Sequence, residues 1–196
     1  MKLVPMHFDY DTNAVSLAAF EQHIKLYNGY IEKFNETSSR LAADDLRAKA
    51  NPTYSEYRGL KQGQGFSAAG VLLHEIYFGG MSARPSRPCT VTMSLLDSAF
   101  GNYKAWMEDF KACAAAARGW CVLAYEPRSE GLTHLLLDSH NDGMVAGTYP
   151  LIALDMYEHS YFRDYGIDRA SYVNNFINSI HWIAVSRRIR SYGLGK

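Results

Sequence analysis

The stretch Leu151-Ile-Ala-Leu-Asp-Met-Tyr-Glu-His-Ser-Tyr-Phe162 joins a short apolar run to an acid and an imidazole. The run is typical of a buried strand that ends at Asp155, and His159 follows four residues later. If the chain turns helical there, this spacing places carboxylate and imidazole on one face. A carboxylate buried among aromatic side chains needs a charge partner, and a metal ion would also fix His159 as a neutral ligand. The stretch therefore predicts half of a metal site.

The same stretch resembles the signature of the iron/manganese superoxide dismutases, in which an Asp-x-Trp-Glu-His run supplies two of four metal ligands. Here the run reads Asp155-Met-Tyr-Glu-His159, so both ligands match and Tyr157 replaces the Trp. The resemblance extends downstream to Tyr165, Arg169 and Tyr172, and upstream to residues 99–111 and 118–124. It is dense from about residue 66 to residue 182 and thin before it, which implies a divergent member of the family.

Composition bounds the function classes. The chain has 196 residues and a formal net charge of zero, without a basic run, zinc-knuckle spacing or glycine-rich phosphate loop, so we expect no nucleic-acid partner. No apolar run is long enough for a membrane span, and we expect neither a membrane association nor a signal peptide. The odd set of Cys89, Cys113 and Cys121 is expected to be buried, reduced thiols, which favours the cytoplasm.

The first half of the chain has helical periodicity. Ser16 is a good cap for a helix that carries Phe20, His23, Tyr27, Tyr30 and Ile31 along one face. Gly65 precedes a second apolar helix, predicted over Phe66–Phe78. The segment 81–92 contains prolines and lacks periodicity, so it is the expected domain boundary.

The second half mixes structural classes. We expect a helix over about residues 94–117, then strands at 120–125, 132–137 and 150–155, and helices to the end. The predicted fold class is α+β: an N-terminal helical hairpin domain, residues 1–83, followed by a C-terminal α/β domain, residues 90–196, with a small three-stranded antiparallel sheet. The family's fold is the same.

The resemblance implies two further ligands, both on the helices of the first half. A lone His74 among apolar residues is usually a core histidine, but its flanks match the helix of the family's second ligand. The first ligand is His23 or Gln22: counting forward favours His23, and counting back from Tyr30 favours Gln22. Because Gln is a poor ligand for a redox metal, we take His23, with Tyr30 as the gateway phenol.

Three imidazoles and one carboxylate suit iron or manganese, one ion per subunit, and the lack of thiolates argues against structural zinc. With one carboxylate, a trivalent ion bearing hydroxide and a divalent ion bearing water both leave a net charge of +1. Such a site attracts an anion in either oxidation state, which suits superoxide.

The resemblance also implies a group that hydrogen-bonds the metal-bound solvent and tunes it. Gly70 occupies one of the family's two positions for that group and has no side chain, whereas His140 stands at the other. This combination resembles certain iron-using branches and favours iron weakly. Trp120 matches a Trp that lines the pocket.

Several residues depart from the family pattern. Tyr27 replaces a second His of the first helix, and Phe78 and Tyr157 replace tryptophans. Phe162 replaces a Tyr that reaches the other subunit in the family. Glu158 is retained, and the resemblance implies a homodimer in which Glu158 pairs with the partner's ligand His159.

The sequence therefore predicts an antioxidant enzyme, a metal-dependent superoxide dismutase that converts superoxide to oxygen and hydrogen peroxide. The alternatives are a non-dismutase metalloprotein and a non-catalytic interaction module on the same fold.

Overall fold

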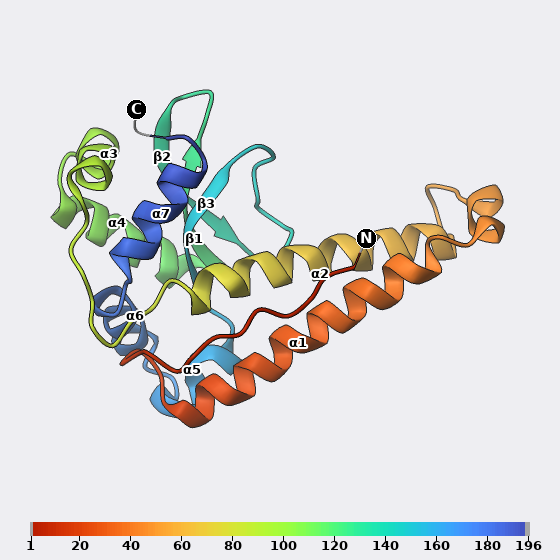
Figure 1. Ribbon diagram of the computed structural model, residues 1–196, viewed down its shortest axis with the longest axis horizontal. Helices are drawn as coiled ribbons and strands as arrows, with labels where there is room; N and C mark the ends of the chain where they lie inside the picture. The colour runs from red at the N-terminus through yellow and green to blue at the C-terminus, as the bar shows by residue number, and fades with distance from the viewer. Residues whose placement is uncertain (1, 195–196) are drawn as a thin grey trace.

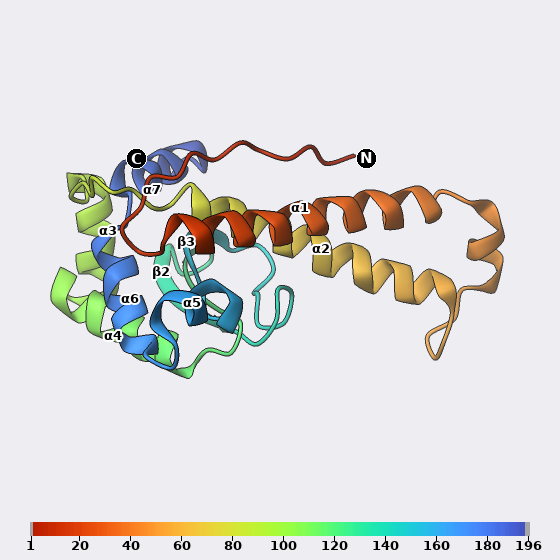
Figure 2. The same cartoon turned by 90° about the horizontal axis from the view of Figure 1, so that it is seen from below.

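The computed structural model describes residues 2–194, except for the side chain of Asp44. Two long antiparallel helices project from a body of helices packed around a small sheet, and the N-terminal segment runs beside the first helix (Figures 1 and 2). The elements are α1 (Leu17–Arg40), the 3-10 helix η1 (Asp44–Lys49), α2 (Glu56–Phe78), α3 (Thr90–Phe100), α4 (Tyr103–Ala116), β1 (Trp120–Glu126), β2 (Gly131–Leu137), β3 (Tyr149–Asp155), α5 (Glu158–Tyr165), α6 (Arg169–Asn178) and α7 (Trp182–Ser191).

The α+β fold class is confirmed. The division into units 1–83 and 90–196 stays a prediction, and Met1, Gly195 and Lys196 at its outer ends lie outside the described residues. Among the described helices, none combines the length and the apolar character needed to cross a membrane.

In the α1–α2 hairpin, α1 begins where the sequence predicts, but α2 is longer than predicted. Ser16 caps α1 by accepting a hydrogen bond from the Ala19 amide, as expected. The expectation that the second helix begins after Gly65 is wrong, because Ser55 caps α2 ten residues earlier by accepting from the Arg58 amide. Glycine lowers helix propensity by about 1 kcal/mol, but packing of α2 along α1 overrides that cost. The Gln64 side chain donates to Ser38 across the two helices.

The single helix expected over residues 94–117 is two helices. Gly101 has a φ of 86°, a left-handed conformation that ends α3, and Asn102 then caps α4 by accepting from the Ala105 amide. Gly101 therefore ends one helix, and the adjacent Asn102 begins the next.

The three strands form the expected antiparallel sheet, in the order β2-β1-β3, with bounds within one residue of those predicted. The register places Trp120 of β1 opposite Asp155 of β3 and also opposite Leu137 of β2. Residues directly opposite in antiparallel strands share a face, so Trp120 and Asp155 point to the same side of the sheet. That side faces α2, whose His74 ring lies 5.0 Å from the Trp120 ring, centroid to centroid.

The three cysteines are free thiols in different environments. Cys121 is buried, Cys113 is partly exposed and Cys89 is exposed, so the expectation of three buried thiols holds for Cys121 alone. Cys89 precedes α3 at the surface, where its sulfur contacts the hydroxyl groups of Thr92 and Ser186.

Candidate metal centre

Four side chains from four elements converge where the helical hairpin meets the sheet. His23 comes from α1, His74 from α2, Asp155 from the end of β3 and His159 from α5. One potential ligand atom from each lies within 4.8 Å of all the others. The side chains of His23, His74 and Asp155 are at most 3% exposed, whereas that of His159 is 31% exposed. The cluster is therefore closed on three sides and reaches the surface through α5.

The carboxylate of Asp155 is the centre of the cluster. Its Oδ2 lies 3.2 Å from Nε2 of His23 and from Nε2 of His159, and 3.7 Å from Nε2 of His74. Its Oδ1 accepts a hydrogen bond from the amide of Tyr157 at 2.9 Å. Burial acts to raise the pKa of Asp155, but hydrogen bonds with His159 and His23 bring this pKa well below its usual range. The site therefore holds a carboxylate anion.

His74 shows that the cluster is set up for an ion. Its Nδ1 donates to the carbonyl oxygen of Gly70, one turn earlier in α2, at 2.6 Å. Burial lowers the pKa of His74 to about 3, so the ring is neutral and its single proton sits on Nδ1. Nε2 is then a bare lone pair, and within residues 2–194 it has no hydrogen-bond partner. Buried polar atoms are rarely left unpaired, and a metal ion would satisfy this one.

The geometry of α1 separates the two candidates for the first ligand. His23 is buried and its ring lies 4.9 Å from the His74 ring, whereas Gln22 is exposed on another side of α1. Metal ligation by the four residues stays a prediction, but only His23 of this pair lies in the cluster.

Tyr27 and Tyr30, also on α1, have separate surroundings. The Tyr27 hydroxyl donates to Glu75 and accepts from the Met6 amide, so it fastens the N-terminal segment to α2. The Tyr30 ring lies 5.3 Å from His74 and 4.6 Å from His140, and burial raises the pKa of Tyr30 to about 12. Of these two tyrosines, Tyr30 therefore has its ring nearer to that of His74, and it is protonated at neutral pH.

His140 lies behind the cluster and is 1% exposed. The indole Nε1 of Trp120, which can only donate, makes a 2.9 Å hydrogen bond to its Nδ1. Burial lowers the pKa of His140 to about 4, so the ring is neutral and its proton sits on Nε2. Trp120 thus holds His140 in the tautomer that can donate from Nε2.

Gly70 and Phe66 complete the wall around His140. A Cβ atom on Gly70 would lie 3.2 Å from His140 Cδ2 and 3.3 Å from Tyr30 Cγ, so both rings use the space that the missing side chain leaves. The Phe66 ring packs 4.5 Å from the His140 ring. This role of Phe66 was not predicted from the sequence, although Phe66, Gly70 and His74 recur every four residues on one face of α2.

Tyr172, a position of the family resemblance, has a role at the site that was not predicted from the sequence. Its buried hydroxyl donates to the backbone carbonyl of Asp155 at 2.9 Å and also contacts the Tyr77 hydroxyl. It thereby fixes the end of β3 from which the carboxylate projects.

Comparisons with known proteins show the family of the chain. Residues 90–188 match the family described as "Iron/manganese superoxide dismutases, C-terminal domain". A protein named "Superoxide dismutase [Fe]" from Aquifex aeolicus is 36% identical over 189 residues, which cover 95% of this chain and 87% of that relative. One named "Superoxide dismutase [Mn] 1" from Halobacterium salinarum is 31% identical over 187 residues, covering 92% and 90%. The chain belongs to the iron/manganese superoxide dismutases.

Membership of this family agrees with a cluster made only of nitrogen and oxygen donors. The relatives include proteins named for iron and proteins named for manganese, so the comparisons support this pair of metals. The fold, with helices before a three-stranded antiparallel sheet, is consistent with the family.

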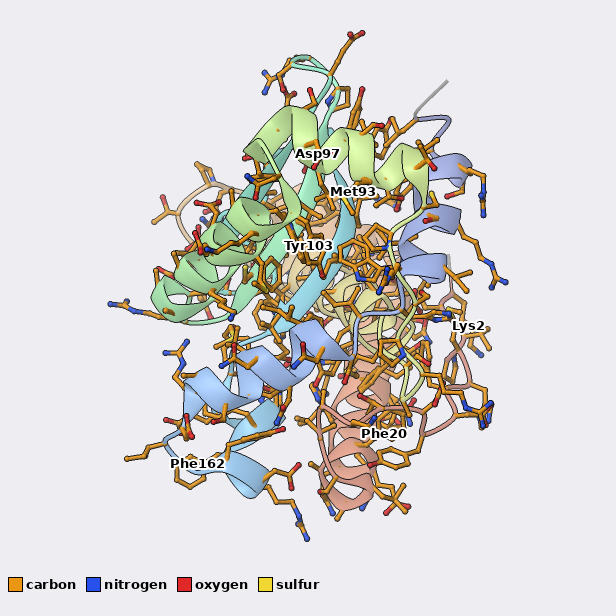
Figure 3. All side chains as sticks on the ribbon, turned by 90° about the vertical axis from the view of Figure 1, so that its left-hand side faces the viewer. Lys2, Phe20, Met93, Asp97, Tyr103 and Phe162 are labelled. Carbon is orange, nitrogen blue, oxygen red and sulfur yellow. The ribbon has the colours of Figure 1, made fainter. Side chains whose placement is uncertain are left out.

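Four residues outside the cluster differ in their surroundings. Arg169 donates to the carbonyl oxygens of Ala114 and Ala117, so its guanidinium is committed to the end of α4. Lys25 is exposed on α1. Glu158 is exposed beside His159, and Phe162, 52% exposed, lies on the outer side of α5 (Figure 3).

Proposed function

We propose that this protein is a superoxide dismutase that converts superoxide to oxygen and hydrogen peroxide at one iron or manganese ion per subunit. The observation that carries the proposal is the cluster of His23, His74, Asp155 and His159, in which the lone pair of His74 Nε2 has no hydrogen-bond partner among the described residues. Membership of the dismutase family supports it.

The donor set fits such an ion. Three imidazole nitrogens and one carboxylate oxygen lie close enough together to bind a single cation, and Asp155 supplies one negative charge to it. The bound ion would supply one-electron chemistry, because iron and manganese alternate between divalent and trivalent states. Net positive charge inside a poorly solvated pocket would draw in the superoxide anion.

The residues around the cluster would donate protons to it. Peroxide formation consumes protons, and neutral His140 carries its proton on Nε2 because Trp120 occupies Nδ1. We propose that His140 donates from Nε2 to solvent in the cluster and so tunes its acidity. The protonated phenol of Tyr30, packed against His140 and His74, would donate to solvent or substrate on the adjacent side.

We favour iron over manganese. The support is the pairing of a side-chain-free Gly70 with His140, whose Cδ2 lies in the space that a residue at 70 would use. We also propose a cytoplasmic protein, supported by the three free thiols.

We propose a homodimer through the exposed Glu158 and His159. A Glu158 carboxylate from a second copy could accept a hydrogen bond from His159, whose ring is the one open side of the cluster. Such an exchange across a two-fold axis would close both sites at once.

The test is to load the purified protein separately with iron and with manganese, quantify the bound metal and follow superoxide decay by stopped-flow absorbance. We expect about one ion per subunit and rapid decay, fastest with iron. Stoichiometric metal without faster decay than the metal-free protein would indicate another metalloprotein. Failure to bind either metal would indicate a non-catalytic module.

A further inference from the structure

Arg188 of α7 joins the two elements that carry His74 and Asp155. Its Nη1 donates to the carbonyl oxygen of Leu151 in β3 at 2.9 Å, and its Nη2 donates to the carbonyl oxygen of Ile76 in α2 at 3.1 Å. Ile76 lies two residues after His74, and Leu151 lies four residues before Asp155. One guanidinium group therefore bridges α2 and β3.

Leu151 is the residue at which the register of β3 changes. The register set by Asp155 and Trp120 holds back to Ile152. It is shifted by one residue at Pro150, so Leu151 is a β-bulge without a partner in β1. Because side chains alternate along a strand, continuing the register of Pro150 would turn Asp155 to the other face of the sheet, away from Trp120. The bulge at Leu151 thus decides which face carries the carboxylate.

The carbonyl oxygens that Arg188 binds are acceptors that the secondary structure leaves open. Ile76 is in the last turn of α2, where carbonyl groups lack partners within the helix and a nearby cation is favoured by the helix dipole. Leu151 is buried and lies in β3, an edge strand of the sheet. Burial lowers the pKa of Arg188 to about 10, so the group is a cation at neutral pH. No carboxylate among the described residues forms an ion pair with it, and the two carbonyl oxygens are its partners.

We propose that Arg188 is a positioning residue for the metal cluster. By holding the bulge of β3 against the last turn of α2, it fixes the register from which Asp155 meets His74. Lysine cannot reproduce this bridge, because its ammonium group is a point charge on a flexible stem, whereas the planar guanidinium binds two acceptors in fixed directions. The consequence for metal binding rests on the proposed function, whereas the consequence for the strand does not.

The test compares Arg188→Lys with two control variants of the same helix. Val185→Ala truncates a buried side chain of α7, and Arg187→Lys makes the same chemical change at an exposed position. Cobalt(II) is the probe, because nitrogen and oxygen donors bind it and its visible absorption reports the coordination geometry. Competition with a chelator gives the affinity. We expect Arg188→Lys to weaken cobalt binding by about tenfold or more and to change the visible spectrum, whereas both controls keep the affinity and the spectrum of the unmodified protein.

A second measurement needs no metal. In the metal-free protein, hydrogen exchange of the peptide that covers residues 149–155 should be faster in Arg188→Lys than in Val185→Ala. The inference is overturned if affinity, spectrum and this exchange are the same in the two variants. If the unmodified protein binds no cobalt, the proposed function fails, and the exchange of β3 alone decides the inference: faster exchange in Arg188→Lys supports it, and equal exchange overturns it.

The bridge can also be tested in the unmodified chain, which keeps the inference open to refutation if a variant does not fold. With 15N-labelled arginine, Nη1 and Nη2 of Arg188 should give separate NMR signals, because the two carbonyl oxygens hinder rotation of the guanidinium group. A single averaged signal would show that the bridge is not held, and would overturn the inference.

Discussion

The hydrogen bond from Trp120 to His140 allows a quantitative test of how the second layer of the site is built. Both side chains are at most 1% exposed, and the bond runs from the indole Nε1 to Nδ1 at 2.9 Å. Trp120→Phe keeps an aromatic ring but removes the donor, which leaves Nδ1 as an unsatisfied buried acceptor. An orphaned acceptor costs about 1–3 kcal/mol. Roughly 40 Å³ of unfilled space adds about 1 kcal/mol at 24 cal/mol per Å³.

The variant should therefore lose roughly 2–4 kcal/mol of unfolding free energy. Its turnover should fall further than its metal content, because neutral His140 is no longer held with its proton on Nε2. The assay is urea unfolding of the metal-free protein, since a bound ion would add its own stabilisation. A double-mutant cycle with His140→Ala isolates the hydrogen bond, for which we expect a coupling of about 1 kcal/mol. Additive single changes, with unaltered turnover in Trp120→Phe, would refute this account of His140.

Three further outcomes follow from the same geometry. His23→Ala should lose most of its bound metal, whereas Gln22→Ala should keep it, as measured by elemental analysis of the two purified variants. The opposite result would show that Gln22 is the ligand. Glu158→Ala should sediment as a monomer with reduced metal retention, and a fully loaded dimer would exclude this residue from the interface. In the metal-free protein, the pKa of His74 is lowered to about 3 and that of His140 to about 4, below the unfolded value of 6.5. Between the folded pKa of each ring and 6.5, the unfolded chain binds more protons than the folded protein. The free energy of unfolding should therefore fall as the pH is lowered towards 4, by up to about 1.4 kcal/mol per pH unit for each ring. Denaturation curves at several pH values measure that slope, and a flat profile would contradict buried neutral imidazoles.

The sequence predicted the parts of the fold that depend on local signals. The strand that ends at Asp155 and the cap at Ser16 carry their own patterns, so their positions were accurate. The start of α2 was missed because Gly65 suggested a boundary, whereas contact with α1 stabilises the helix from Glu56 onward. The break at Gly101 was missed because the apolar pattern continues across it.

The candidate site also has features that were predicted from the sequence and features that were not. The resemblance and the spacing proposed four ligands, and the structure brings those side chains together. The indole bond that sets the tautomer of His140 depends on strand register and loop path, which no local pattern reveals. The packing of Phe66 on His140 was recoverable in principle, since its spacing from Gly70 places the two on one helix face.

The wide spacing of the four candidate ligand residues along the chain has a consequence for how the enzyme would acquire a metal. They extend from residue 23 in α1 to residue 159 in α5, so the chelating set does not exist until the hairpin has docked on the sheet. The nascent chain would offer no preformed site, so the ion would be acquired after folding, and its availability would contribute to which ion is bound. Once inside, the ion would cross-link four elements, and its escape would require several side chains from different elements to release it. Exchange should therefore be slow, so that the cell's metal supply at the time of synthesis decides which form of the enzyme persists.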